Sequence, residues 1–242
     1  MKNKTILVTG ATAGIGKALA QSLSAQGARV IITGRDQDKV SRVSDAIGCT
    51  GFVADSANIA QIQQLADALQ RDQVRLDGLV LNAGVFYPEA VASTSEEAFN
   101  LTMNINTKGP FFTLQKLQPL LNNPASVVFV SSIAVTRGFA NAAVYAASKA
   151  AFEAMARVAN LEFADKGIRI NSVRPGVTAT DIQAKAGMTA AQQSELFNSL
   201  DETVLGRVMT PADQIGAIEF LLSDASLAMR SAIIEVDGGY QL

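Results

Sequence analysis

Short apolar runs alternate with longer stretches of helical periodicity along the whole chain, and this alternation limits the possible folds more than any other feature. The apolar runs are bounded by Gly, Asn or Asp and lie at residues 5–8, 29–32, 51–53, 78–81, 126–130, 168–171 and 232–236. The helical stretches lie at residues 15–26, 37–47, 59–70, 96–121, 143–164 and 212–222. Most of the runs are almost continuously apolar, which is typical of parallel strands covered on both faces. The sequence therefore predicts an α/β fold with a seven-stranded parallel sheet flanked by helices on both faces.

One segment, at about residues 183–205, interrupts this alternation. Long connections in compact domains are commonly functional, so we expect the segment to be a substrate lid. Thr189 and Gln192 form a capping-box pattern that opens a short helix within it. A surface helix that only packs on the core is the alternative. No linker, repeat or low-complexity tract divides the chain, so we expect a single doubly wound, Rossmann-type domain over residues 1–242.

The composition excludes several classes of protein. The chain has no histidine and one cysteine, Cys49, which excludes Ser-His-Asp and Cys-His catalysis, an intramolecular disulfide and most zinc sites, and we expect no metal. A formal net charge of −2 provides no field that would attract nucleic acid. The apolar run at residues 6–8 is shorter than a signal peptide requires, and no run reaches the ~18 apolar residues of a membrane span. We therefore expect a soluble, cytoplasmic protein that binds neither nucleic acid nor membranes.

Three glycines, Gly10, Gly14 and Gly16, lie in the turn between the first predicted strand and the first predicted helix. Glycines in such a turn let backbone N–H groups approach a pyrophosphate at the positive end of the helix dipole. A P-loop is excluded, because Ala11 and Ala18 stand where that motif requires a glycine and a Ser or Thr. The turn predicts dinucleotide binding, although three glycines can also serve only to make a tight turn.

The end of the second predicted strand bears on the choice between NADP(H) and NAD(H). It reads Thr33-Gly34-Arg35, and dinucleotide folds use a carboxylate near this point for the ribose of NAD and an arginine for the 2′-phosphate of NADP. Gly34 supplies no carboxylate, and Arg35 offers a planar set of donors to a phosphate. NADP(H) is therefore favoured. NAD(H) is possible if Asp36 turns inward, and Arg35 can also be an ordinary solvated arginine.

The strongest chemical signal combines Ser132 with Tyr145 and Lys149. Tyr145 and Lys149 are four residues apart in a predicted helix, so both side chains lie on the same face one turn apart. A nearby cation favours the phenolate, and Lys149 with an oxidised nicotinamide could lower the pKa of Tyr145 from about 10. Tyr145 could then exchange a proton with a substrate oxygen while Ser132 hydrogen-bonds that oxygen. Tyr-x-x-x-Lys alone is weak evidence, because a half-buried tyrosine and a solvated lysine can produce it.

The order and spacing of these motifs resemble those of the short-chain dehydrogenase/reductase family. The resemblance runs from Thr5 to Gly239 and includes Asn82-Ala83-Gly84, Asn104-Ile105-Asn106, Pro175-Gly176 and Val236-Asp237-Gly238-Gly239. It implies a catalytic role for Ser132 as substrate orienter, Tyr145 as acid/base, Lys149 as ribose-binding lysine and Asn106 as holder of a relay water. In addition to Arg35, the cofactor-binding positions are those that the resemblance implies: Gly10, Thr12, Gly14, Ile15, Gly16, Asp55, Ser56, Asn82, Ala83, Gly84, Tyr145, Lys149, Pro175, Gly176, Val177 and Thr180.

Simpler interpretations of three of these residues remain open. Asn82 can be a turn cap, Asp55 a loop carboxylate, and Asn106 a kink residue that bonds the backbone. The resemblance also implies a homo-oligomer, a tetramer, formed through the long predicted helices at residues 96–121 and 143–164. Small and apolar side chains on the second helix fit this, although packing inside one chain would use the same pattern.

The sequence predicts an NADP(H)-dependent oxidoreductase that transfers hydride between nicotinamide and a ketone, an aldehyde or a secondary alcohol. Apolar side chains are expected to form the substrate pocket, unless they only pack in the core: Phe86, Tyr87, Phe139, Met188, Leu196, Phe197 and Leu200. A 3-oxoacyl-thioester reductase is an alternative, made less favourable by Asn122-Asn123, where carrier-protein reductases of the family have basic residues. Enoyl reductases space tyrosine and lysine more widely, which disfavours double-bond reduction. A regulator that binds NADP(H) without catalysis is the other alternative, since fold alone does not determine function.

Overall fold

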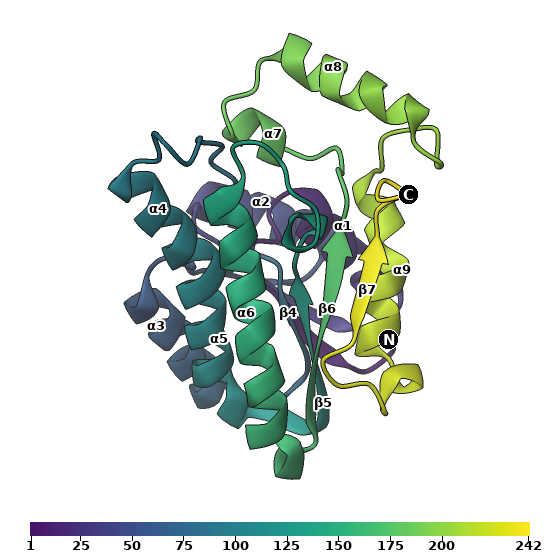
Figure 1. Cartoon of the computed structure of the whole chain (residues 1–242). Coiled ribbons are helices and arrows are strands. Elements are labelled where there is room, and N and C mark those ends of the chain that lie inside the picture. Colours follow the sequence, from purple (N-terminus) through teal and green to yellow (C-terminus); the bar gives the residue numbers. More distant parts are fainter.

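The computed structural model describes residues 1–242, and at its centre lies one parallel sheet (Figure 1). The strands are β1 Thr5–Val8, β2 Arg29–Gly34, β3 Thr50–Val53, β4 Leu76–Leu81, β5 Leu121–Val130, β6 Ile168–Pro175 and β7 Ile233–Val236. Their order across the sheet is β3-β2-β1-β4-β5-β6-β7, and each neighbouring pair is parallel. The predicted seven-stranded, doubly wound sheet is confirmed. The order reverses between β1 and β4, and folds of this kind bind ligands beyond the carboxyl ends of the strands at that point.

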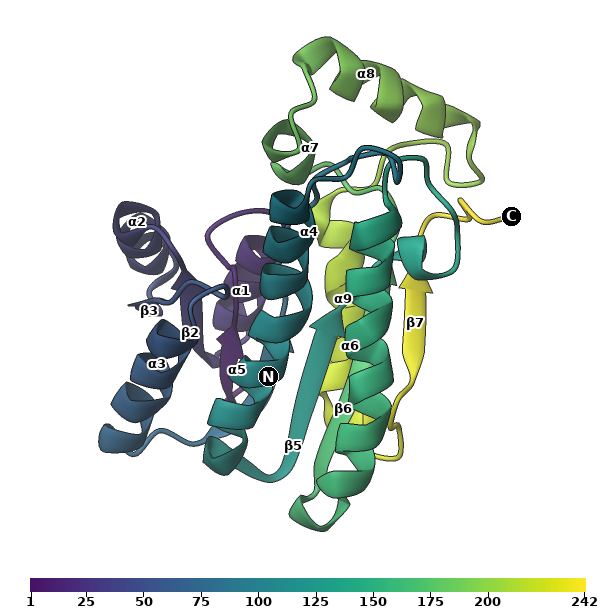
Figure 2. The same ribbon diagram turned by 60° about the vertical axis from the view of Figure 1, so that its left-hand side comes forward.

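Helices cover both faces of the sheet (Figure 2). One layer contains α1 Gly14–Ala25, α2 Gln37–Ile47 and α9 Pro211–Leu222, and the other contains α3 Ile59–Arg71, α4 Glu96–Met103, α5 Gly109–Leu117 and α6 Ala143–Glu162. Two further helices, α7 Ile182–Lys185 and α8 Ala190–Ser199, lie beyond the carboxyl edge of the sheet (Figure 1). Single 3₁₀ turns connect several elements: η2 Gln118–Leu120, η3 Ile133–Val135, η4 Ala164–Lys166, η5 Leu200–Glu202 and η6 Asp224–Ser226. None of the helices is both long enough and apolar enough to cross a membrane.

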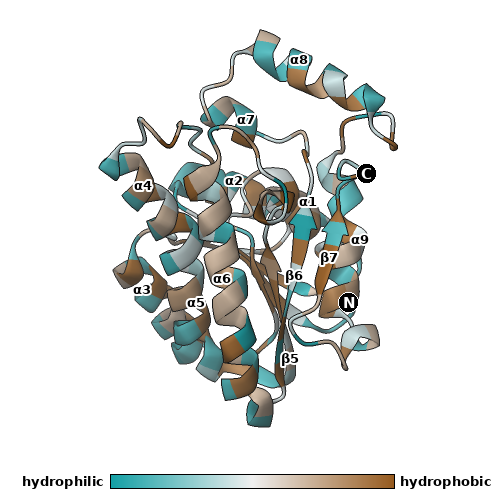
Figure 3. Cartoon of the chain, in the orientation of Figure 1, coloured by the Kyte–Doolittle hydropathy of each residue, from teal (hydrophilic) through white to brown (hydrophobic).

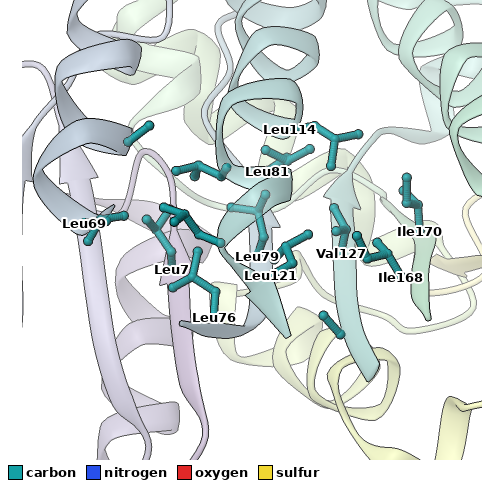
Figure 4. Packing of buried hydrophobic residues seen from close by; sticks show 14 of the residues in the cluster. Leu7, Leu69, Leu76, Leu79, Leu81, Leu114, Leu121, Val127, Ile168 and Ile170 are labelled. Atoms are coloured by element: carbon teal, nitrogen blue, oxygen red, sulfur yellow. The ribbon is translucent and has the colours of Figure 1, made fainter. Parts of the chain in front are cut away.

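The strands are apolar because both of their faces are buried. Along β1, Leu7 faces the layer of α3, α5 and α6, whereas Ile6 and Val8 face the layer of α1, α2 and α9. Figure 4 shows the hydrophobic core between the sheet and the layer of α3, α5 and α6, in which leucines of β1 and β4 pack beside Leu69 of α3 and Leu114 of α5. In Figure 3 the central strands are mostly brown, the colour of hydrophobic residues, whereas the helices around them carry both teal and brown residues. This two-sided burial explains why the strand segments lack alternation of polar and apolar residues.

Helix starts are capped by short polar side chains at several positions, but not at α1. Asp36 accepts a hydrogen bond from Lys39 N at the start of α2, and Asn58 and Ser95 cap α3 and α4 in the same way. The capping box expected at Thr189 and Gln192 is present at α8. Ala13 precedes α1 and provides no side-chain cap. The first N–H groups of α1 are therefore left without side-chain partners, at the helix end that carries the positive dipole.

The segment predicted as one helix over residues 96–121 is helical as far as Leu120, but it is not one regular α-helix. α4 ends at Met103, a π-helical turn, η1, spans Asn104–Lys108, and α5 follows; β5 then starts at Leu121, earlier than expected. The wide turn forms where Asn106 is completely buried and its side chain bonds to backbone outside the helix. Hydropathy periodicity does not reveal such a turn, because its cause is a contact with a distant part of the chain.

Candidate active site

A cavity of about 610 Å³ lies along the carboxyl edge of the sheet. Its walls are formed by the residues that follow the strands: Gly10 after β1, Arg35 after β2, Asp55 after β3, Asn82 after β4, Ser132 after β5 and Gly176 after β6. The segment with α7 and α8 adds Ile182, Gln183, Met188 and Leu196. Residues far apart in sequence therefore meet here because parallel strands all end at one edge.

The glycine turn is built for close approach of backbone. Gly10 and Gly14 have positive φ angles of 62° and 54°, which favour glycine. A Cβ on Gly10 would lie 2.8 Å from Ala83 Cα, and one on Gly14 would lie 3.3 Å from the Thr180 side chain. Both glycines line the cavity in front of the uncapped start of α1. This part of the site fits the pyrophosphate of a dinucleotide, since Gly10 and Gly14 carry no side chain and the start of α1 has no side-chain cap.

Gly16 has a different place from the other two glycines. It does not line the cavity, and a Cβ there would collide with the Asn82 amide. That amide donates hydrogen bonds to Thr9 O, at 2.9 Å, and to Gly10 O, at 3.1 Å. The Thr9 hydroxyl in turn accepts bonds from the backbone N–H groups of Asn82 and Ala83, at 3.0 and 3.1 Å. Gly16 thus makes room for a clamp between the glycine turn and the end of β4, and Asn82 both lines the cavity and holds the turn.

The end of β2 presents Arg35 to the cavity, exposed and without an ion-pair partner. Gly34 has no space for a side chain, because a Cβ would lie 2.6 Å from Thr12 Cγ2 and 3.0 Å from Val40 Cγ2. Asp36 is used as the cap of α2, which lowers the pKa of its carboxyl through the bond from Lys39 N. The carboxylate that would accept the ribose of NAD is therefore absent at position 34 and turned toward the helix at position 36.

Asp55 and Ser56 line the cavity after β3. The Asp55 carboxylate accepts a bond from Ala57 N at 2.9 Å, and the backbone N–H of Asp55 donates to Gln61 Oε1 at 2.8 Å. One Asp55 oxygen thus organises the local turn, as the simpler interpretation of this residue expected, and the residue also faces the cavity.

Ser132, Tyr145 and Lys149 meet on one wall of the cavity. Ser132 follows β5, and the other two lie one turn apart on α6, as their spacing predicts. The Lys149 ammonium is buried, lies 5.8 Å from the centre of the Tyr145 ring and donates a 2.8 Å hydrogen bond to Val130 O. A Cβ on Gly84 would lie only 3.1 Å from Lys149 Nζ, so glycine at position 84 makes room for the ammonium.

Burial shifts the proton affinities of this group. Desolvation raises the pKa of Tyr145, and a hydrogen bond with the Ser132 side chain works against that rise. Desolvation lowers the pKa of Lys149 to about 8, partly offset by the negative charge of Glu153. The lowered tyrosine pKa expected from the sequence is therefore not present in the protein alone. Lowering it requires further positive charge in the cavity, as an oxidised nicotinamide would provide.

Asn106 lies behind this wall and does not line the cavity. Its Oδ1 accepts a bond from Val85 N at 2.8 Å, and its Nδ2 donates to Val85 O at 2.9 Å and to Ser148 Oγ at 3.1 Å. The side chain is thus fully engaged with protein groups. It joins η1, the loop after β4 and helix α6, which matches the simpler interpretation of Asn106 as a kink residue that bonds backbone.

Pro175, Gly176, Val177 and Thr180 line the cavity after β6, where the sequence placed them. A Cβ on Gly176 would lie 2.7 Å from Asp237 Cα, so this loop packs directly on the segment after β7. Gln183 Nε2 donates a 2.9 Å bond to Thr178 O and ties α7 to the same loop. Gln183 is buried and lines the cavity, a role that its type and position do not indicate.

Aromatic and apolar groups surround the catalytic wall. Phe86 packs edge-on against Tyr145 with ring centres 5.1 Å apart, and Phe139 stacks on Tyr240 at 5.9 Å. Of the side chains expected from the segment at 183–205, the structure places Met188 and Leu196 in the cavity wall, whereas Phe197 and Leu200 are not among the lining residues. Sequence reasoning missed Tyr240. The available signal was its position, since residues after a parallel strand reach the same edge as those after its neighbours.

The comparisons with known proteins agree with this geometry. The fold and the cavity define a nucleotide-binding oxidoreductase, and a family model described as "Enoyl-(Acyl carrier protein) reductase" matches residues 10–241. A 3-oxoacyl-[acyl-carrier-protein] reductase of Thermotoga maritima is 31% identical, with 99% of this chain and 98% of that protein covered. A solved short-chain dehydrogenase/reductase of Brucella melitensis has a TM-score of 0.91 and 28% identity, covering 99% of this chain and 97% of that one. BdcA, solved in complex with NADPH, has a TM-score of 0.86 and 25% identity, covering 99% and 95%.

The chain belongs to the short-chain dehydrogenase/reductase family. Further matched relatives are named galactitol 2-dehydrogenase and 2,3-dihydro-2,3-dihydroxybenzoate dehydrogenase. It is accordingly an NAD(P)-dependent oxidoreductase that acts on CH–OH groups.

Proposed function

We propose that this protein uses NADP(H) to interconvert a small or medium ketone or aldehyde and the matching alcohol. The observation that carries the proposal is the meeting of Ser132, Tyr145 and Lys149 on one wall of a cavity whose opposite end is the glycine turn and the uncapped start of α1. When bound there, the cofactor supplies or accepts the hydride at its nicotinamide carbon. The chain's own residues bind it, orient the carbonyl and move the proton.

Each catalytic residue has a separate task in this proposal. Tyr145 holds the proton that passes to or from the substrate oxygen, and its raised pKa suits proton donation to a developing alkoxide. Ser132 hydrogen-bonds that oxygen as its negative charge grows. Lys149 binds the nicotinamide ribose and adds positive charge near the phenol. Asn106 acts by fixing the backbone behind Lys149, since its side chain bonds Val85 and Ser148.

The preference for NADP(H) is supported at the end of β2. Arg35 is free to pair with a 2′-phosphate, and the space beside Gly34 is filled by Thr12. A matched structure that contains NADPH is consistent with this preference. NAD(H) stays the alternative, and titration of both cofactors into the purified protein tests the choice.

The substrate end of the cavity supports an uncharged, apolar carbonyl compound. Its walls carry Phe86, Tyr87, Phe139, Tyr240, Met188 and Leu196. Its charged side chains Asp181 and Lys185 lie 3.6 Å apart and partly neutralise each other. This end of the cavity thus has no net positive charge to favour a phosphate or coenzyme A group. Consumption of NADPH, followed by absorbance over a panel of ketones, aldehydes and alcohols, tests the proposal.

A 3-oxoacyl-thioester reductase is the second candidate, because a matched relative bears that name. The argument against it from Asn122 is weaker than the sequence indicated. Asn122 lies at the start of β5, at the edge of the sheet opposite the cavity, and donates a hydrogen bond to Asp77. Comparing a 3-oxoacyl thioester with the corresponding free ketone in one assay distinguishes the two functions. Reduction of a carbon–carbon double bond, which the family model's description names, is opposed by the one-turn spacing of Tyr145 and Lys149.

Self-association is also proposed. Val158 and Leu161 of α6 are 54% and 79% exposed, and Phe99 and Phe111 of the adjoining helices are exposed as well. Phe152, another apolar residue of α6, is instead buried against Phe129 in the core. Sedimentation equilibrium tests whether the chain forms the expected homotetramer.

A further inference from the structure

Glu153 is a buried carboxylate for which the proposed reaction has no direct use. It lies on α6 one turn beyond Lys149 and is 5% exposed. Arg174 donates two hydrogen bonds to it, from Nε at 2.9 Å and from Nη2 at 2.7 Å. Ser131 donates a third from its hydroxyl at 2.6 Å. A carboxylate held by three donors in the interior has a fixed position.

The partners of Glu153 are the direct neighbours of proposed site residues. Ser131 precedes Ser132 at the end of β5, and Arg174 precedes Pro175 at the end of β6. Glu153 thus ties the helix that carries Tyr145 and Lys149 to the two strand ends that face it.

Arg174 extends this network to the end of the chain. Its Nη1 donates a 2.8 Å bond to Glu235 on β7, and Glu235 accepts a 2.9 Å bond from Gln241, the neighbour of Tyr240 in the cavity wall. The inner part of the network is buried, whereas the Glu235 side chain is 38% exposed. Glu153 and Glu235 therefore share one cation but differ in burial and in their place relative to Lys149.

Glu153 is also the acidic group that acts on Lys149. Burial lowers the pKa of that ammonium to about 8, and the negative charge of Glu153 opposes the shift. The other groups around Lys149 come from four elements, and only Tyr145 among them is titratable: the Tyr145 phenol on α6, the Val130 carbonyl on β5, Gly84 after β4 and the Asn106 amide on η1. Arg174, on β6, reaches this region through its bonds to Glu153. Glu153 is thus the carboxylate that favours the charged form of this buried lysine.

We propose that Glu153 is a positioning residue, whose charge keeps Lys149 protonated at neutral pH and whose hydrogen bonds fix the ends of β5 and β6 beside it. This inference rests on the proposed function, in which Lys149 binds the cofactor. Loss of the Lys149 proton weakens cofactor binding, so the affinity for NADPH falls above the pKa of Lys149 in the free protein. Removing the charge of Glu153 shifts this loss of NADPH affinity to lower pH.

The experiment measures NADPH binding by its fluorescence between pH 6.5 and 9.5, which requires no knowledge of the substrate. In the wild-type protein the plot of log Kd against pH bends near pH 8. In Glu153→Gln, which keeps the shape but not the charge, we expect the bend about one pH unit lower. Glu235→Gln is the matched control, since it removes the other carboxylate on Arg174, and its curve should superimpose on that of the wild type.

Two more variants make the outcome decisive. If Glu153→Gln does not fold because Arg174 loses its buried partner and keeps only the half-exposed Glu235, the double variant Glu153→Gln/Arg174→Gln removes both buried charges, and its bend should still move down. Lys149→Met should bind NADPH more weakly and without a bend. A bend that disappears in Lys149→Met but stays near pH 8 in the Glu153 variants overturns this inference alone. A bend that persists in Lys149→Met removes Lys149 from cofactor binding, and the proposed function fails with it.

Discussion

The Lys149 ammonium donates a 2.8 Å hydrogen bond to the carbonyl oxygen of Val130, the last residue of β5. That carbonyl lies at the end of a central strand, so the ammonium is held beside the strand end that leads to Ser132. The side chain is therefore oriented toward the cavity without any ligand, and burial of its ammonium lowers the free energy of unfolding. A lysine that lowers stability in this way can be recognised in unfolding measurements.

Replacing Lys149 by Met should stabilise the protein at pH 7. The pKa of Lys149 falls from 10.5 to about 8 on folding, which costs roughly 3 kcal/mol at 1.36 kcal/mol per unit. Loss of the hydrogen bond to Val130 O lowers the free energy of unfolding by about 1 to 2 kcal/mol. We therefore expect the free energy of unfolding of Lys149→Met to exceed that of the wild type by about 1 to 2 kcal/mol. Denaturant unfolding monitored by circular dichroism measures it.

The same substitution has a characteristic pH dependence. The folded-state pKa of Lys149 lies below its value in the unfolded chain, so between pH 8 and 10.5 the unfolded chain holds more protons and wild-type stability rises with pH through this group. The advantage of Lys149→Met should accordingly shrink as the pH increases above 8. An advantage that is the same at pH 7 and pH 10 would mean that Lys149 carries no burial penalty.

Replacing Tyr145 by Phe should lower turnover by about a hundredfold or more, because it removes a proton donor worth about 10² to 10⁴ in rate. The ring remains, and with it the packing on Phe86. NADPH affinity should therefore stay within about twofold of the wild type. Initial rates at saturating NADPH, with fluorescence binding as the control, measure both. Wild-type turnover in this variant would remove Tyr145 from the mechanism.

Replacing Arg35 by Ala should weaken NADPH binding by about tenfold or more and leave NADH binding nearly unchanged. A charge-assisted bond to phosphate contributes about 1.5 to 3 kcal/mol, and only NADPH has a phosphate at this point. Parallel titrations with the two cofactors check the prediction, and added salt should reduce the difference between them. Equal losses for both cofactors would contradict the phosphate contact.

Gly34→Asp alone should not convert the protein to NAD(H). The new Cβ would lie 2.6 Å from Thr12 Cγ2, so the substitution should lower stability and weaken both cofactors. The double variant Gly34→Asp/Thr12→Gly removes that contact and should bind NADH more tightly than Gly34→Asp does. Thermal unfolding and NADH titration compare the two variants. Tight NADH binding by the single variant would show that Thr12 does not restrict this position.

The sheet and most helices could be predicted from sequence because their causes are local. Strands buried on both faces are continuously apolar, and caps such as Asn58 and Ser95 are short-range signals. The break in the helix at residues 104–108 could not be predicted, since it follows from bonds between Asn106 and residues 21 and 42 positions away.

The residues of the candidate site also differ in whether the sequence alone could reveal them. The ligand-facing residues carried motifs with a chemical meaning, and most of them line the cavity. The residues that hold them in place carried none: Glu153 and Arg174 look like ordinary surface charges in the sequence, and only the fold buries them against each other. Tyr145 lies where its motif predicts, but the rise of its pKa in the protein alone could not be predicted, because desolvation depends on the surrounding structure.

The chain's last residues have a practical consequence for handling the protein. Tyr240 lines the cavity, and Gly238 and Gly239 pack against Leu205 and Val204 at the end of the segment that carries α8. The residues before β1 lie at the opposite edge of the sheet. A purification tag joined behind Leu242 would therefore emerge beside the cavity wall that Tyr240 forms, whereas a tag joined ahead of Met1 would lie at the other edge of the sheet.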